Sequence, residues 1–550
     1  MLIELLLIPC LLIFFAGWGI VAKKLIRNKT NSFTLTILLG FSFFGIVACL
    51  LSFFIPLNLY VEIILLVLSL IPFFSKKLRI YSVNFPKEIL RSAWFWIFCI
   101  IIILAGSYYP FRPDHFYYYT STLNWLNQYG LIIGVANIEW FLGQMSVFHI
   151  IQAAIDQTID PFKRISVFLT ILFLIYIFER KTYLLLFIIT VCFFFIQSPS
   201  PDVAIFLLTL IIVNELSFNY RTENYLIFFM ISVFIFTIKP VAFWLPLWVF
   251  IAGFFLNKNE LKDYRLYLIS TLIIIIFFTK NVIASSTLFY PVSLTKIDTY
   301  WLTDMRILEL SNQNASLYTF KRSFTIDEIN SMSFVEKVYN WLTINKLQTI
   351  INCVIVIVIT VFGFFSFKKK DSLYKVLWII IVFKTVVIFS FSGQFRFLID
   401  GIFPLLLLMF YPVNKRKIQV IAVSLFFSIS SLISISYPPL LNHAIPDLLL
   451  TKWMKGFTKK SLVIPDYYKK IKYADENLGN LNFNISAHPY DYDTPLPAFT
   501  HSVLKQYHEL GIFPQMKDSE NIRKGYYMKI LTQEEKQKLG NMIKKYFPDQ

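Results

Sequence analysis

The sequence predicts an all-α polytopic membrane protein with about fourteen transmembrane helices and a small soluble C-terminal region. Hydrophobic residues make up 57% of the 550 residues and charged residues only 15%, which is less charge than a soluble protein of this size carries. Apolar runs of about 16–22 residues, long enough to cross a bilayer, recur along the chain. We expect spans at residues 2–22, 33–55, 58–75, 93–109, 164–179, 182–197, 202–217, 225–239, 241–256, 265–283, 347–367, 373–391, 397–413 and 417–436.

The basic residues of the short loops predict the orientation of these spans. Lys23, Lys24 and Arg27 follow the first span, and further Lys and Arg residues follow at alternate loops. Because positively charged loops stay cytoplasmic, we expect both termini and the long polar loops on the periplasmic side of a bacterial inner membrane. The same rule accounts for the formal net charge of +18, so this charge does not predict nucleic-acid binding.

The polar segments between spans divide the chain into four regions. In order, these are the N-terminal spans, a large outer loop, a transmembrane core with a second outer loop at 284–346, and a C-terminal periplasmic region: 1–107, 108–163, 164–436 and 437–550. The last region is polar and mixed in charge, and it is long enough to fold alone.

The first outer loop carries the clearest functional signal. Residues 108–150 follow a span but are too polar to cross a bilayer, and the acid Asp114 comes directly after Pro113. An amphipathic helical pattern follows, which places apolar side chains on one face; these are Phe116, Tyr119, Leu123, Leu126 and Tyr129. We expect these helices to lie against the outer membrane surface, with Asp114 directed toward the lipid headgroups.

Two acids at span ends are candidate catalytic residues. Asp114 is a candidate general base, because a carboxylate can take a proton from an acceptor hydroxyl or amine; the alternative is an N-cap of the following helix. Asp202 follows the segment Ser198-Pro199-Ser200-Pro201 and opens a span on the same face. It would orient the acceptor or hold a divalent cation, Mg²⁺ or Mn²⁺, and the alternative is a carboxylate stabilised at a helix N-terminus.

Cations near the outer side are candidates for binding phosphate. Arg396 in the segment SGQFRF and Lys239 before Pro240 would hold the phosphate of a lipid-linked donor. We expect Lys280 and Lys384 to extend toward the interface instead. Asp400 lies one helical turn after Arg396, and we expect these two to pair.

The C-terminal region contains one polar cluster, His488, Asp491 and Asp493, for which a metal site and a turn are both conceivable. No second His or Cys stands at ligand spacing, so turn chemistry with the neighbouring prolines is favoured, and no metal ligands are assigned. The sequence has no GxxxxGK[ST] loop, GxGxxG, HExxH or GxSxG motif, which argues against ATP-driven transport by this chain.

This arrangement resembles the GT-C class of integral-membrane glycosyltransferases, in which the first large outer loop carries an essential acid soon after a span. The stretch PDHFYYYTSTLNW matches that loop, and Asp114 matches its acid. More closely, the chain resembles an uncharacterised family of bacterial multi-pass membrane proteins associated with surface-polysaccharide genes. The similar stretches are PDHFYYYTSTLNWLNQYGLIIGVANIEWFLG, SPSPD, NVIASSTLFYP, GQFRF and DTPLP. Tyr119 and Glu139 stand where that family's pattern has histidines.

The resemblance implies a membrane glycosyltransferase that moves a sugar from a polyprenyl-phosphate-linked donor to a glycan or lipid acceptor of the cell envelope. Asp114 and Asp202 would be catalytic, Arg396 and Lys239 would bind the donor phosphate, and His115, Tyr119 and Asn137 would belong to the acceptor loop. Two alternatives remain: a polymerase or ligase of lipid-linked glycans, and a lipid or polysaccharide exporter. The concentration of polar residues on one side favours an enzyme over an exporter.

Overall fold

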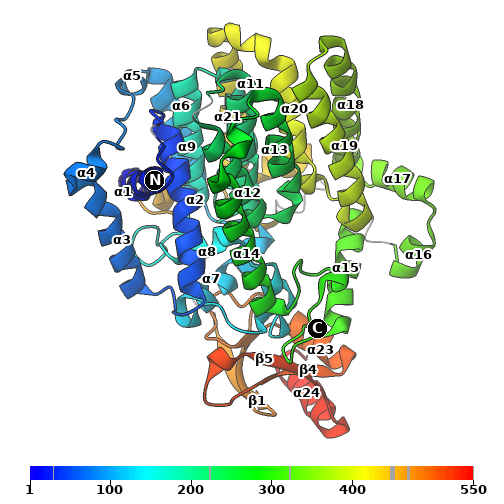
Figure 1. Ribbon diagram of the computed structural model, residues 1–550. Coiled ribbons are helices and arrows are strands. Elements are labelled where there is room, and N and C mark those ends of the chain that lie inside the picture. The colour runs from blue at the N-terminus through cyan, green and yellow to red at the C-terminus, as the bar shows by residue number, and fades with distance from the viewer. Residues whose placement is uncertain (29, 222–223, 321–323, 446–451, 467–470, 549–550) are drawn as a thin grey trace.

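The fold is a helical bundle that carries a small mixed α/β region at one end (Figure 1). The computed structural model describes residues 1–28, 30–221, 224–320, 324–445, 452–466 and 471–548. Residues 471–548 cover one end of the bundle. We call these residues the cap, and the end that they cover the capped end.

Seven helices of the bundle are long and apolar enough to cross a membrane, judged by length and composition among the described residues. They are α1 (Leu2–Leu25), α2 (Phe33–Ser52), α11 (Pro201–Phe218), α14 (Tyr264–Ser285), α18 (Lys346–Lys369), α19 (Ser372–Ser392) and α21 (Lys417–Ser436). Shorter apolar helices complete the bundle: α3 (Leu59–Phe74), α6 (Ala93–Gly106), α9 (Ile165–Arg180), α10 (Leu186–Cys192), α12 (Tyr225–Ile238), α13 (Trp244–Leu256) and α20 (Ile399–Phe410).

Each of the fourteen predicted segments therefore contains a helix of the bundle, and the predicted helical membrane class is confirmed. The number of crossings stays a prediction, because several helices are shorter than the roughly 20 residues that a bilayer requires. The segment 182–197 is one example, since it forms a short turn followed by α10, which ends at Cys192.

The remaining elements lie at the ends and along one side of the bundle (Figure 1). The helices are α4 (Lys76–Arg79), α5 (Lys87–Leu90), α7 (Thr120–Tyr129), α8 (Val147–Ala153), α15 (Met305–Thr319), α16 (Ile326–Ser331), α17 (Phe334–Leu342), α22 (Pro438–Ala444), α23 (His501–Leu510) and α24 (Gln533–Tyr546). The strands are β1 (Tyr473–Leu478), β2 (Leu481–Ser486), β3 (Ala498–Phe499), β4 (Ile512–Met516) and β5 (Tyr526–Ile530). β1–β2–β3 form one sheet and β4–β5 form an antiparallel pair. The sequence analysis did not predict these strands.

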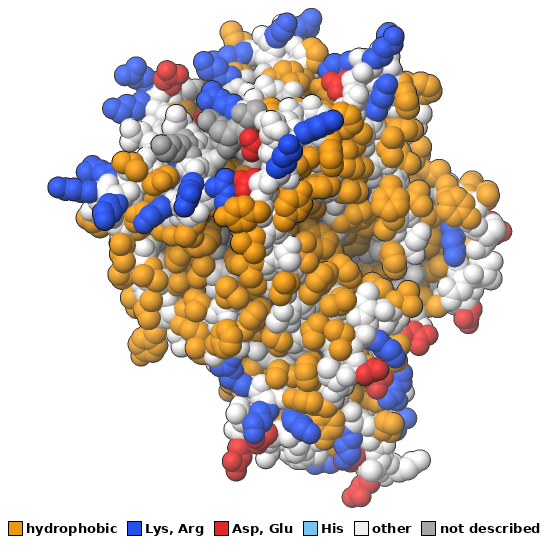
Figure 2. Space-filling model, viewed as in Figure 1, with side chains coloured by type: hydrophobic (Ala, Val, Ile, Leu, Met, Phe, Trp, Pro, Cys, Tyr) orange, Lys and Arg blue, Asp and Glu red, His pale blue; other side chains and the backbone are white. Residues whose placement is uncertain are grey.

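An apolar belt covers the middle of the face shown in Figure 2. Lys and Arg gather beyond the belt at the end opposite the cap, and charges of both signs occupy the capped end. Large apolar side chains of α18 and α19 are exposed, including Ile357 and Phe364 on α18 and Phe383 and Val386 on α19. Lipid chains can cover such a surface at no hydrophobic cost, whereas a soluble protein rarely exposes a contiguous apolar area of this extent.

Charged side chains inside the bundle are paired, which corrects three expectations. Asp400 forms an ion pair with Lys384 and accepts a hydrogen bond from Trp244 Nε1 at 2.8 Å, so it does not pair with Arg396. Lys384 is therefore buried and does not extend to the interface. Lys280 is also buried, and its ammonium group donates to the backbone oxygen of Met145. Burial in the bundle makes a direct partner necessary for each charge.

The apolar face of the first outer loop is buried within the protein, whereas we expected it to lie against the membrane surface; α7 packs on α8. The cap contacts the loop through hydrogen bonds: Asn124 donates to the backbone oxygen of Tyr492, and Tyr507 donates to those of Asn137 and Ile138. Gly130 ends α7 with a φ of +76°, and a Cβ there would lie within 2.8 Å of backbone oxygens at the end of α2.

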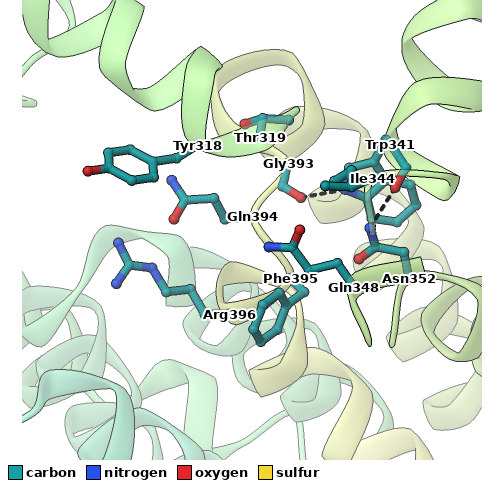
Figure 3. Close-up of a pocket in the computed structure, with 10 residues that line it drawn as sticks. All are labelled: Tyr318, Thr319, Trp341, Ile344, Gln348, Asn352, Gly393, Gln394, Phe395 and Arg396. Carbon is teal, nitrogen blue, oxygen red and sulfur yellow. Dashed lines mark hydrogen bonds between the residues drawn. The ribbon is translucent and has the colours of Figure 1, made fainter. Parts of the chain in front are cut away.

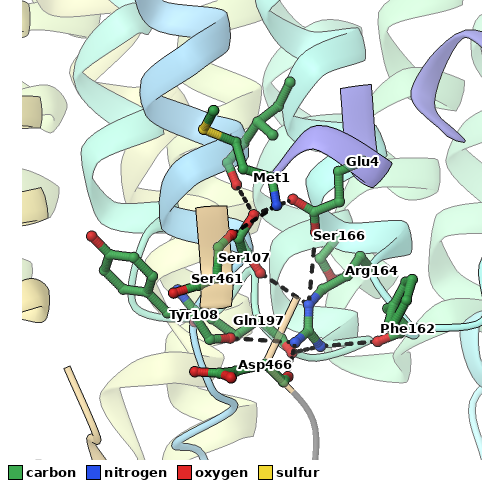
Figure 4. Close-up of polar contacts among 12 residues, drawn as sticks. Met1, Glu4, Ser107, Tyr108, Phe162, Arg164, Ser166, Gln197, Ser461 and Asp466 are labelled. Atoms are coloured by element: carbon green, nitrogen blue, oxygen red, sulfur yellow. Dashed lines mark hydrogen bonds and ion pairs between the residues drawn. The ribbon is translucent and has the colours of Figure 1, made fainter. Parts of the chain in front are cut away.

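Arg164, just before α9, joins the loop, the bundle and the C-terminal region (Figure 4). Its guanidinium group is buried and donates to the backbone oxygens of Gly106, Tyr108, Phe162, Gln197 and Asp466. Its Nε also lies 3.9 Å from a carboxylate oxygen of Glu4. One side chain thus donates to carbonyl groups from four separate parts of the chain, and a buried carbonyl group requires such a donor.

Replacing Arg164 by methionine should strongly destabilise the protein, because the change leaves buried carbonyl groups without donors and Glu4 without its cation. Losing one partner of a buried ion pair typically costs about 3–5 kcal/mol. The measurement is the melting temperature of the detergent-purified full chain. The matched control is Arg265→Met, which removes a more exposed arginine that pairs with Asp263. Equal melting temperatures for the two variants would contradict the central role of Arg164.

Candidate functional site

The capped end of the bundle contains a cluster of two carboxylates and three cations. Asp114 Oδ2 lies 3.1 Å from Arg396 Nη1 and 3.7 Å from Arg112 Nη2. Asp202 Oδ1 lies 2.5 Å from Lys239 Nζ. We call these five residues the charged cluster. The residues come from four separate segments, so only the folded chain brings them together.

Breaks in helical structure place each of these side chains. Asp114 precedes a π-helical turn, His115–Tyr119, and makes no capping bond to that turn among the described residues, which removes the N-cap alternative. Asp202 lies in the first turn of α11 after Pro201. Lys239 ends α12 because Pro240 cannot continue that helix. Arg396 lies in a short 3₁₀ turn between α19 and α20.

The two ion pairs of the charged cluster lie close enough to influence each other. Burial alone would lower the pKa of Arg396, but the charges of Asp114 and Asp202 outweigh this effect and raise that pKa above its usual value. Arg396 therefore remains cationic at any physiological pH. The structure thus brings together the four residues that we predicted to act in one reaction. Two are the predicted catalytic acids, and the other two, Arg396 and Lys239, are the predicted phosphate-binding cations.

Aromatic rings support the three cations. The Phe397 ring centre lies 4.4 Å from Lys239 Nζ and 5.1 Å from Arg396 Cζ, and that of Phe195 lies 4.3 Å from Arg112 Cζ. Such contacts hold a cation in place without neutralising it. The Nε atoms of Arg112 and Arg396 are buried and have no hydrogen-bond partner within the described part of the chain. These two Nε donors and the part-exposed carboxylate of Asp114 are the groups of the site that are available to bind a ligand.

The three predicted acceptor-loop residues occupy different places. Tyr119 is buried beside the charged cluster, and burial, together with the charges of Asp114 and Asp202, raises the pKa of its hydroxyl group. Burial, together with Arg164 and Lys163, lowers the pKa of His115 well below its usual value, so its imidazole is neutral. Asn137 lies elsewhere: its amide donates to the backbone oxygens of Trp301 and Tyr526 and connects the loop to the cap.

The cap approaches the charged cluster through the turn that contains Tyr490 and Asp491. The ring of Tyr490 stacks on Phe116 at 6.1 Å and lies near enough to Asp114 for that carboxylate to raise its pKa, although burial contributes more. Asp491 is buried and accepts a hydrogen bond from Ser121 at 3.0 Å. The C-terminal region therefore covers the outer loop next to the site, in agreement with the turn that the sequence predicts at 488–500.

The donor atoms of the charged cluster do not fit a divalent cation. Each carboxylate already pairs with at least one cation. No group of three or more His, Cys, Asp or Glu side chains suited to a metal ion occurs among the residues that the structure describes. We therefore assign no step of a reaction to a metal ion.

Sequence reasoning missed Arg112, which stands between Pro110 and Pro113. Its place two residues before Asp114 was an available signal, because prolines on both sides restrict how far its side chain can move from the acid. The sequence contained only a weaker indication that Lys384 pairs with Asp400. Both charges lie in predicted spans, where an ionisable residue is expected to have a partner.

The fold and the charged cluster define an α-helical membrane protein with a charged site at the capped end. The chain belongs to a family described as a domain of unknown function (DUF8201), whose model matches residues 1–403. No curated protein and no solved structure matches the chain. The matched segment contains all five residues of the charged cluster and ends before the cap.

The contact between the loop and the cap should weaken as the pH rises. Burial raises the pKa of Asp491 to about 7, from an ordinary value of 3.8, although Ser121 opposes the shift. A carboxyl group with a raised pKa stabilises the fold most below its unfolded pKa, and this contribution is lost as the pH rises toward 7. We expect the full chain to melt at a lower temperature at pH 8 than at pH 5.

Asp491→Asn should reduce this pH dependence, by up to about 4 kcal/mol across the full range between the two pKa values. Part of the dependence should remain, because burial is the main cause that raises the pKa of Glu139, and this cause persists when Asp491 is replaced. The matched control is Asp475→Asn, which changes an exposed acid on β1. If Asp491→Asn and wild type lose the same stability between pH 5 and pH 8, the buried Asp491 does not control the contact.

Proposed function

We propose that this protein is a membrane glycosyltransferase that moves a sugar from a polyprenyl-phosphate-linked donor to a cell-envelope acceptor. The observation that carries the proposal is the ion pair between Asp114 and Arg396, beside Asp202 and Lys239, at the capped end of the bundle. A lipid-linked donor presents its phosphate at the membrane surface, and three cations at that depth match its charge.

The charge balance of the cluster suits a phosphodiester. Three cations and two carboxylates leave one net positive charge, and a polyprenyl phosphate sugar carries one negative charge. When the sugar leaves, the lipid phosphate gains a second negative charge. The cations then interact more strongly with the product phosphate than with the donor, and this difference lowers the barrier.

In the proposed reaction, the acceptor hydroxyl oxygen attacks the anomeric carbon of the donor sugar. The bond from that carbon to the phosphate oxygen breaks, and its electron pair leaves with the lipid phosphate. Asp114 takes the proton of the acceptor hydroxyl group. Its side chain is 29% exposed, which gives an acceptor access to a carboxylate that Arg396 and Arg112 hold in position. Asp202 keeps Lys239 in place, and Lys239 faces the same phosphate.

The distribution of surface charge supports an orientation with the cap on the periplasmic side. Lys and Arg gather at the opposite end of the apolar belt (Figure 2), where the positive-inside rule places the cytoplasm. In this orientation the charged cluster lies at the outer leaflet of the inner membrane. The donor would reach the cluster from the bilayer and the acceptor from the periplasm.

Asp114→Asn should abolish transfer while leaving the protein folded, because the amide cannot accept the proton. Loss of a general base typically slows a reaction by about 10²–10⁴-fold. The measurement is the surface glycan and the polyprenyl-linked sugar pool of a strain that carries the variant, with protein level checked by immunoblot. We expect lost or shortened glycan and an enlarged lipid-linked pool.

Asp304→Asn is the matched control, since Asp304 also pairs with an arginine, Arg306, but lies outside the charged cluster. It should leave both readouts unchanged. Unchanged glycan at normal expression of Asp114→Asn would contradict the enzyme and favour the exporter. If the Asp114→Asn strain loses the surface polymer but still transfers single sugars normally, the result would favour the polymerase or ligase.

A further inference from the structure

A cavity of about 110 Å³, with Arg396 among its lining residues, lies between the second outer loop and α18 (Figure 3). Its walls come from the end of α15, from α17, from the start of α18 and from the segment between α19 and α20. Three of its lining residues carry side-chain amides, namely Gln348, Asn352 and Gln394, and four carry aromatic or guanidinium groups, namely Tyr318, Trp341, Phe395 and Arg396.

The polar groups of this cavity are held in place and retain hydrogen-bonding capacity. Trp341 Nε1 donates to the backbone oxygen of Gly393 at 2.6 Å, and Asn352 Nδ2 donates to that of Trp341 at 2.7 Å. Asn352 Oδ1 is buried and has no hydrogen-bond partner in the described part of the chain. An unsatisfied buried acceptor is costly and is a feature of sites that a ligand completes.

This combination of side chains suits a sugar ring. Amides both donate and accept hydrogen bonds, as the hydroxyl groups of a sugar do, and aromatic rings offer flat apolar surfaces to its C–H groups. The cavity is smaller than the roughly 300–1,000 Å³ of a site for a drug-sized ligand. One sugar ring is therefore a better match than an oligosaccharide.

We propose that the cavity is the subsite that binds the sugar ring of the lipid-linked donor, an inference that rests on the proposed function. Arg396 belongs both to the cavity and to the charged cluster, so a phosphate bound at Arg396 places its attached sugar at the opening of the cavity. Gln348 and Gln394 bind hydroxyl groups of the ring, and Trp341 lies against it. The subsite thus distinguishes a glycosylated lipid phosphate from a bare one.

The surroundings of the cavity fit a ligand that is attached to a membrane lipid. α16 and α17 project from the side of the bundle next to α18 and α19 (Figure 1). The outer face of α17 exposes Val335 and Tyr339, whereas its inner face supplies the buried Trp341. The exposed faces of α17, α18 and α19 are apolar, so the polyprenyl chain can remain among lipid chains while its head group occupies the site.

The test compares binding of bare and glycosylated lipid to the full chain in detergent by native mass spectrometry. The probes are undecaprenyl phosphate and its phosphate-linked glucose, N-acetylglucosamine and arabinose derivatives. At least one glycosylated probe should bind about tenfold more tightly than the bare lipid, the gain expected from one or two added hydrogen bonds. Gln348→Leu and Gln394→Leu should each reduce this preference without weakening the binding of undecaprenyl phosphate.

Gln313→Leu is the matched control, because Gln313 lies on α15 outside the cavity, and it should keep the full preference. Arg396→Gln should weaken binding of every probe. If undecaprenyl phosphate does not bind, or binds equally to Arg396→Gln, the proposed function and the subsite are both overturned. If the bare lipid binds through Arg396 but no glycosylated probe is preferred, or the glutamine variants keep the preference, only the subsite is overturned.

Discussion

The architecture of the capped end depends on one buried guanidinium group. Arg164 donates to carbonyl oxygens at the end of α6, in the outer loop, before α11 and in the C-terminal region. These are places where the chain leaves regular helices, so their backbone groups lack helical partners. A planar group with five donors can satisfy several of them from one position. This arrangement connects the bundle, the outer loop and the segment that precedes the cap.

The charged cluster joins segments that are far apart in the sequence. Asp114 and Arg396 are 282 residues apart in sequence and meet because the loop and the α19–α20 connection lie at the same end of the bundle. Their pairing reduces the cost of placing charges at the edge of an apolar bundle. The buried Nε donors of Arg112 and Arg396 have no hydrogen-bond partner within the described residues. Ion pairs that are stable without ligand, together with unused donors, are a suitable basis for recognising an anion.

The cap covers the outer loop next to the charged cluster. Its turn at Tyr490 and Asp491 lies on the outer loop, and α23 supplies Tyr507, which donates to loop carbonyl groups. The family match ends at residue 403, so the cap lies outside the segment that the family model covers. The charged cluster therefore lies within the family segment, whereas the cap that covers the neighbouring loop lies beyond it.

Apolar runs of bilayer length determined the helical membrane class, because hydrophobic length alone decides whether a segment can cross a membrane. The polar break before Asp114 and the prolines beside Asp202 and Lys239 also marked residues that the fold brings together in the charged cluster. The sequence did not determine partners. Asp400 bonds to Lys384 and not to Arg396, which is nearer in sequence, and the apolar face of the amphipathic loop is buried within the protein. Local periodicity shows that a helix face is apolar, but it does not show which part of the protein covers that face. Ion pairs form between residues that are far apart in sequence, and only the tertiary fold brings such residues together.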